Sequence, residues 1–124
     1  MDIINSDQAP KAIGPYSQAI RAGNVIYTSG QIALDPATGA LVEGDFAAQA
    51  HRVFENLKAV LAAGGATFAN VAKATVYLTD LANFTTLNEI YASYFGATKP
   101  ARTTVGVAQL PKGGLVEIDL VAIV

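Results

Sequence analysis

The sequence predicts an α+β fold in which two helices pack on one face of a mixed β-sheet. The predicted elements run as several strands, a helix, a strand, a second helix and two closing strands. Each predicted helix has one apolar stripe, as expected of a helix that covers a sheet. The last predicted strand, Leu115–Val124, is mostly apolar on both faces, although a sheet covered on one side only should have a polar second face. We therefore expect neighbouring subunits to cover that second face.

Length and composition restrict the class of protein. The chain has 124 residues, enough for a single domain spanning 1–124, and it is 52% hydrophobic and 15% charged, which excludes a disordered segment. Eight Lys and Arg residues against ten Asp and Glu residues give a net charge of −2. The basic residues are scattered from Lys11 to Lys112 and form no basic run, so nucleic acid is not an expected partner.

Residue types that are scarce or missing exclude further classes. The chain has no cysteine, which excludes a disulfide framework, a thiolate nucleophile and a Cys-based metal site. His51 is the only histidine and lies on a helix flank among charged neighbours, so neither a metal site nor a Ser–His triad is expected. No secretory signal opens the sequence, and the run Ala59–Ala66 is too short to span a membrane, which favours a cytoplasmic protein.

The first third of the chain predicts short strands separated by turns. A strand is expected over Asp2–Asn5, followed by a loop over Gln8–Tyr16 that contains two prolines. Gln18–Ala22 and Asn24–Ser29 predict a hairpin around Gly23-Asn24. Residues 35–39, Asp-Pro-Ala-Thr-Gly, predict a further turn.

Two helices are predicted by their apolar spacing and their end signals. Asp45 is the expected cap of a helix over Phe46–Ala63 that Gly64-Gly65 ends. A second helix is expected over Asn83–Phe95, with Gly96 as its stop. The expected buried stripes are Phe46, Ala50, Val53, Phe54, Leu57, Val60 and Leu61 in the first helix, and Phe84, Leu87, Ile90, Tyr91 and Tyr94 in the second.

Three strands complete the sheet. One is predicted over Val71–Thr79, between the helices, and two closing strands are predicted over Ala101–Val107 and Leu115–Val124. If the closing strands pair as a hairpin with its turn between Leu110 and Pro111, Thr104 lies opposite Glu117 and Arg102 lies opposite Asp119. This register would place Arg102 and Glu117 on one face, in one small pocket.

Arg102 and Glu117 are the main candidates for chemistry. Arg102 begins an otherwise neutral strand, where a partly desolvated guanidinium needs an anion. The anion is either a ligand carboxylate, gripped through two hydrogen bonds, or Glu117 or Asp119 of the same chain. Glu117 interrupts an apolar run, where it either holds and activates a water molecule or pairs with a basic residue.

Four other residues are weaker candidates. Tyr16 follows the rigid Gly14-Pro15 turn and points its hydroxyl toward a ligand or into the loop. Ser29 and Gly30 end a strand, where a hydroxyl and a close backbone approach suit an anion or form an ordinary turn. Asn88 lies at the edge of the second helix's apolar stripe and is a pocket residue or a solvated amide.

Four motifs in order resemble the Rid family, and most closely its RidA branch of enamine and imine deaminases. They are Ala9–Ala19 (APKAIGPYSQA), Tyr27–Ile32 (YTSGQI), Pro100–Arg102 (PAR) and Val116–Ile118 (VEI). The resemblance covers the full length without a large insertion. It implies a chorismate-mutase-like mixed sheet with two helices on one face, assembled into a homotrimeric barrel with clefts between subunits.

The resemblance also implies an activity. Such proteins hydrolyse 2-imino acids, such as 2-iminobutanoate and 2-iminopropanoate, to 2-oxo acids and ammonia without cofactor or metal. The 2-imino acids come from pyridoxal-phosphate enzymes of amino acid metabolism, which the hydrolysis protects. The alternatives are a non-catalytic trimer that binds small carboxylates or acts like a chaperone, and an endoribonuclease, against which the dispersed basic residues argue.

Carried onto this chain, the resemblance gives each candidate a role. Arg102 binds the substrate carboxylate and Glu117 orients the attacking water. The pocket residues are Tyr16, Ser29, Gly30, Asn88 and Thr104. Thr104 stands where many relatives have cysteine and contributes mainly backbone, so no thiol takes part.

Overall fold

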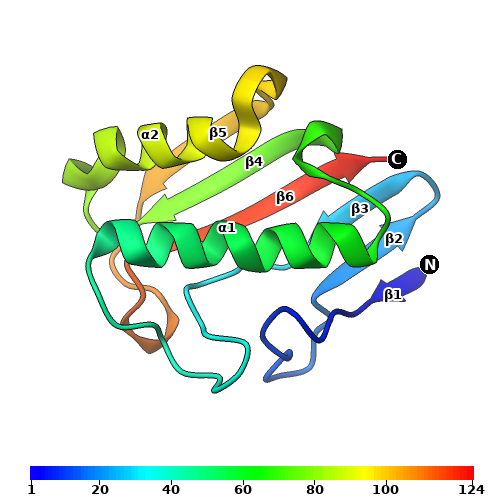
Figure 1. Ribbon diagram of the computed structural model, residues 1–124, viewed down its shortest axis with the longest axis horizontal. Coiled ribbons are helices and arrows are strands. Elements are labelled where there is room, and N and C mark those ends of the chain that lie inside the picture. The colour runs from blue at the N-terminus through cyan, green and yellow to red at the C-terminus, as the bar shows by residue number, and fades with distance from the viewer.

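The computed structural model describes all 124 residues. Its centre is one six-stranded sheet with the strand order β1-β2-β3-β6-β4-β5. The strands are β1 (Asp2–Ile4), β2 (Ala19–Ala22), β3 (Val25–Thr28), β4 (Val71–Leu78), β5 (Ala101–Gly106) and β6 (Val116–Ile123). Helices α1 (Phe46–Ala63) and α2 (Phe84–Phe95) lie across one face of the sheet, as Figure 1 shows. The predicted α+β class and the placement of both helices on one face are confirmed.

The two helices begin and end close to the predicted positions. The side chain of Asp45 accepts a hydrogen bond from the Ala48 amide at 3.0 Å, which satisfies one free N–H group at the start of α1. Gly64 follows its last residue. Gly96 ends α2 with a φ of 56°, a left-handed conformation that favours glycine.

The core lies between the helices and the sheet. Val116, Ile118, Leu120 and Ala122 alternate along β6 and are buried against the helices. Aromatic rings fill the space between α1 and α2, where Phe54 stacks on Tyr94 with 4.7 Å between ring centroids. The predicted stripes are correct except at two positions of α2. Phe84 is 40% exposed, because it lies at the start of α2 beside the edge strand, and Tyr94 is only half-buried.

The N-terminal hairpin and the following turn agree with the sequence. β2 and β3 pair antiparallel with Ala22 opposite Val25, which leaves Gly23 and Asn24 as the connecting residues. In the turn over 35–39, the Gly39 amide donates to the Asp35 carbonyl at 2.8 Å. These segments bring the loop over residues 5–18 and residues 29–34 to the end of the sheet where β6 begins.

The predicted hairpin between the two closing strands is wrong. β4 lies between β5 and β6, and it pairs in parallel with β5 and antiparallel with β6. The physical reason is the helix α2, which connects β4 to β5 as a crossover and therefore places β5 parallel to β4 at the sheet edge. The chain then crosses past β4 to insert β6 beside β3.

The face of the sheet without helices carries both polar and apolar groups. Among its exposed apolar side chains are Tyr27 (51% exposed), Val105 (38%) and Ile123 (41%). Glu117 and Asp119 lie on the same face, two residues apart on β6. No helix of the chain is long and apolar enough to cross a membrane.

Candidate functional site

One half of the candidate site is a cleft at the start of β6. It has a volume of about 280 Å³ and is lined by Tyr16, Ser29, Gly30, Pro111 and Glu117. These residues come from three loops and one strand, far apart in the sequence. The structure thus brings together four of the seven residues that the sequence analysis singled out.

The Glu117 side chain leaves no room for a side chain at position 30, which is glycine. A Cβ atom on Gly30 would lie 2.5 Å from Oε2 and 2.8 Å from Cδ of Glu117, well inside contact distance. The carboxylate therefore packs directly against the glycine backbone. The Gly30 N–H donates to no group within the chain, and it remains available to a ligand at this cleft.

Tyr16 and Ser29 differ in what they can offer. The Ser29 hydroxyl donates to the Ser17 carbonyl at 2.5 Å, so its proton is engaged in holding the two loop segments together. The Tyr16 side chain is 51% exposed, and its oxygen is 3.4 Å from the Ile13 amide, which donates to it. Its own proton remains free, so Tyr16 is the better donor to a bound molecule.

The carboxyl group of Glu117 is half-buried and makes no hydrogen bond within the chain. Burial, and then repulsion from Asp119, raise the pKa of Glu117. Asp119 itself accepts a hydrogen bond from the Tyr77 hydroxyl at 3.1 Å. Glu117 is therefore a carboxylate with free lone pairs and raised basicity, which is what activation of a water molecule requires.

The other half of the candidate site surrounds Arg102 on β5. Its guanidinium carbon lies 4.7 Å from the ring centroid of Tyr91 and 5.5 Å from that of Phe84. Both rings belong to α2, and Asn88 lies one helical turn from each of them. The aromatic rings hold the cation from one side through cation–π attraction and leave its N–H groups free for an anion.

Two buried hydroxyls near Arg102 have no hydrogen-bond partner. They are the Tyr91 hydroxyl and Oγ1 of Thr104. Thr104 lies on the same strand face as Arg102, two residues further along β5. Unsatisfied polar atoms cost free energy when buried, so each one in a folded protein needs an explanation, such as a role in a functional site.

The two halves lie on opposite faces of the sheet. Arg102 of β5 pairs with Ala74 of β4, which pairs with Leu120 of β6, and the Ala74 and Leu120 side chains are buried under the helices. Glu117 of β6 pairs with Tyr77 of β4, and both side chains lie on the uncovered face. With strands about 4.8 Å apart and about 3.3 Å per residue, their Cα atoms are separated by about 14 Å. The hairpin register under which Arg102 and Glu117 would share one pocket is therefore not the one observed, and the chain forms no internal Arg102–Glu117 or Arg102–Asp119 pair.

Sequence reasoning missed the aromatic support of Arg102. Phe84 and Tyr91 were assigned to the buried stripe of α2, and the signal that was available is their spacing with Asn88 at i, i+4 and i+7 on one helix face. His51 is exposed as expected, and its Nδ1 lies 3.1 Å from the Tyr94 hydroxyl. No three His, Asp or Glu side chains are grouped in a way that suits a metal ion.

The fold and these two half-sites define a small α+β protein with one mixed sheet, two helices on one face and an unpaired charged group on each side of the sheet. The sequence model of the family described as Endoribonuclease L-PSP matches residues 6–124. The chain therefore belongs to this family, which includes the Rid proteins, and the resemblance indicated by the four motifs is confirmed.

Individual relatives are similar over almost the whole length. Protein DfrA of Myxococcus xanthus is 58% identical over 97% of this chain and 93% of the relative. The 2-iminobutanoate/2-iminopropanoate deaminase of Bos taurus is 49% identical over 98% of this chain and 88% of the relative. The crystal structure of RidA from the Antarctic bacterium Psychrobacter superposes with a TM-score of 0.96 at 47% identity, covering 100% of both chains.

Proposed function

We propose that the protein hydrolyses small 2-imino acids to 2-oxo acids and ammonia. The observation that carries this proposal is the pair of unneutralised groups, Arg102 on one face of the sheet and Glu117 on the other. A guanidinium recognises a small carboxylate, and a free carboxylate activates water. The name of the relative from Bos taurus, a 2-iminobutanoate/2-iminopropanoate deaminase, supports the same reaction class.

The complete site, in this proposal, forms between copies of the chain. Arg102 lies on β5, at the edge of the sheet, and the uncovered face beside it exposes apolar side chains such as Val105 and Tyr27. When this face of one copy is covered by the next, the Arg102 edge of one copy meets the Glu117 cleft of its neighbour. A closed ring repeats that contact in every copy, and the family resemblance implies a ring of three.

The chemistry follows from these positions. Arg102 binds the carboxylate of the 2-imino acid, with Asn88 beside it. Glu117 accepts a proton from a water molecule as the water oxygen bonds to the imine carbon. The C=N electron pair moves to nitrogen, which takes that proton from Glu117 and so restores the carboxylate. The free Gly30 N–H and the Tyr16 hydroxyl hold the resulting carbinolamine. The C–N bond then breaks, ammonia leaves with the second proton, and the hydroxyl becomes the carbonyl of the 2-oxo acid.

The source of the substrate is an enzyme that forms 2-imino acids from amino acids, such as a pyridoxal-phosphate dehydratase. Imines of this kind already hydrolyse quickly in water, so positioning and one base, typically about 10²–10⁴-fold for general acid–base catalysis, supply enough acceleration.

Two variants with a matched control test the proposal. In an assay that couples a dehydratase to 2-oxo acid formation, Arg102→Ala and Glu117→Gln are each expected to lower kcat/KM by about 100-fold or more. Arg21→Ala is the control, because Arg21 lies on β2 and its Nε donates to the Gly23 carbonyl, far from both half-sites. Wild-type turnover in the Arg102→Ala variant would contradict the proposal.

The same preparations distinguish the other functions. A non-catalytic carboxylate-binding protein would bind a 2-oxo acid through Arg102 and form no product. A ribonuclease would cleave RNA in both Arg102→Ala and wild-type protein. The net charge of −2 and the scattered basic residues give no basic face for RNA, although the family is named for such an activity.

A further inference from the structure

We propose that a water-filled passage inside each chain leads to Glu117 from the surface at residues 36–39 and supplies the water that the reaction consumes. This inference rests on the proposed function. It concerns a route that is separate from the cleft through which the substrate enters.

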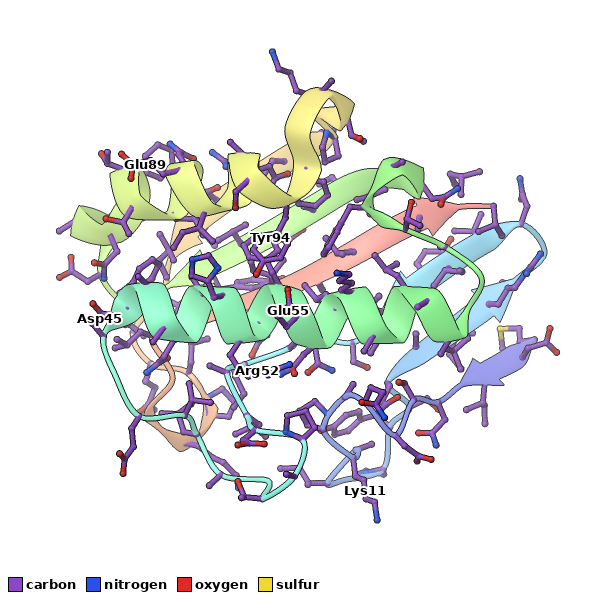
Figure 2. The ribbon with its side chains drawn as sticks, viewed as in Figure 1. Lys11, Asp45, Arg52, Glu55, Glu89 and Tyr94 are labelled. Carbon is purple, nitrogen blue, oxygen red and sulfur yellow. The ribbon has the colours of Figure 1, made fainter.

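Three hollows lie end to end in the structure. The innermost is a cavity of about 90 Å³, which shares four lining residues with the 280 Å³ cleft: Tyr16, Gly30, Pro111 and Glu117. It shares four different residues with a groove of about 340 Å³ at the surface: Pro10, Lys11, Ile13 and Leu34. The cleft and the surface groove share no lining residue, so the cavity lies between them. Lys11, one of the residues shared by the cavity and the groove, lies at the lower edge of the molecule in Figure 2, with its side chain directed away from the protein.

The inner cavity has a polar group that the fold does not use. Gln31 lines it and is only 8% exposed, yet its side-chain amide has no hydrogen-bond partner in the chain. Its backbone is fixed by two hydrogen bonds with Ile118, at 2.9 and 3.2 Å, next to Glu117. Gln18 lines the same cavity and shows the contrast, since its amide nitrogen donates to the Ser6 and Pro10 carbonyls at 3.1 and 2.8 Å. An amide that reaches a cavity and has no partner within the chain is free to bind water there.

The size and the lining of the cavity suit water. At about 30 Å³ for each molecule in the liquid, it has room for about three waters. The Gln31 amide and the Glu117 carboxylate provide polar partners at two of its walls. A neighbouring copy and a bound substrate would exclude bulk solvent from the cleft. Each turnover consumes one water, so a second route keeps Glu117 supplied.

A crystal structure of the wild-type protein at high resolution tests the passage without any activity measurement. The expected result is a file of ordered waters that hydrogen-bond to the Gln31 amide and reach the Glu117 carboxylate. A dry or collapsed cavity would overturn the inference. The proposed function could still be correct in that case, since the substrate cleft could supply the water.

Kinetics provide the second test, once wild-type turnover of 2-iminopropanoate has been established. Ala12 lines only the inner cavity, so Ala12→Leu fills it, whereas Ala37 lines only the surface groove and Ala37→Leu is the matched control. We expect Ala12→Leu to lower kcat by about tenfold with unchanged KM and unchanged affinity for the 2-oxo acid. The control should retain wild-type values.

Two outcomes of the kinetic experiment would overturn the passage. An unchanged kcat in Ala12→Leu would show that water reaches Glu117 through the cleft. A raised KM, with a changed preference between 2-iminopropanoate and 2-iminobutanoate, would show that the cavity holds the substrate side chain. If Ala12→Leu does not fold, Ala12→Val provides the same comparison with a smaller added volume, because Ala12 lines the inner cavity and not the groove.

Discussion

The two half-sites on this chain are built in different ways. Arg102 is positioned by regular structure, between a strand of the sheet and two aromatic rings of α2. Glu117 lies where loops converge, against the backbone of Gly30 and in one cleft with Tyr16. The position of Arg102 therefore depends little on the loops, whereas the position of Glu117 depends on close packing between the loops and β6. In the proposed function, a site divided in this way over two faces of one sheet is complete only when copies associate.

The largest effect that separates the two halves is expected at Gly30. In Gly30→Ala, the new Cβ would displace the Glu117 carboxylate, because the two would be 2.5 Å apart. A displacement of about 1 Å at a reacting group costs about 100-fold, so kcat should fall by that factor while 2-oxo acid binding through Arg102 changes little. Steady-state kinetics and calorimetric titration with a 2-oxo acid measure the two quantities.

Gly114→Ala is the control for this substitution. Gly114 also lies near the cleft, but its added Cβ would be 3.4 Å from the nearest atom, the Pro111 carbonyl oxygen, with a φ of −58°. We expect near wild-type kinetics. Equal losses in the two variants would mean that loop packing in general, and not the position of Glu117, limits turnover.

A smaller effect is expected on the titration of Glu117. Burial and Asp119 raise the pKa of Glu117 above the ordinary 4.5, and a base must be deprotonated to act. Turnover should therefore be lost as the pH falls through a value above 4.5. NMR of labelled glutamate carboxyl carbons, with Glu117→Gln to assign the signal, measures this pKa directly.

The pKa of Glu117 in the Arg102→Ala variant tests whether Arg102 of a neighbouring copy lies close to Glu117. Within one chain Arg102 is about 14 Å from Glu117 and on the other face, too far to matter in the presence of salt. If a neighbouring copy brings its guanidinium to the cleft, removal of that charge raises the pKa of Glu117 further. An unchanged pKa in Arg102→Ala would count against a cleft shared between copies.

The smallest effect is expected at Tyr91. Its hydroxyl is buried without a partner, so Tyr91→Phe should stabilise the protein by about 1 kcal/mol and keep the ring under Arg102. Activity should be unchanged. Tyr91→Leu, which removes the ring, should weaken 2-oxo acid binding. Thermal unfolding and ligand titration measure these effects, and a loss of stability in Tyr91→Phe would mean that the hydroxyl has a partner in the assembled protein.

Much of the fold could be predicted from local signals. The cap at Asp45, the stops at Gly64 and Gly96 and the apolar spacing gave both helices nearly to the residue, because these signals act within a few residues of each other. The pairing of β5 with β4 could not be predicted in the same way. Strand register and order depend on contacts between distant segments, which local sequence does not specify.

The candidate site shows the same limit. Arg102 and Glu117 were identified from their unusual surroundings in the sequence, and the structure leaves both without an internal partner. Their relative position was predicted wrongly, because it followed from the assumed hairpin. Gln31 was not identified at all, since a single glutamine after Gly30 has no distinguishing pattern in the sequence, and only its burial without a partner marks it.

The most direct test mixes two inactive proteins. Arg102→Ala and Glu117→Gln chains, coexpressed or refolded together in equal amounts, should recover about one quarter of wild-type activity, because about that fraction of contacts in a closed ring joins an intact Arg102 to an intact Glu117 of its neighbour. Each variant alone should stay inactive. A mixture that forms mixed oligomers, verified by mass spectrometry, and yet recovers no activity would contradict a site shared between copies.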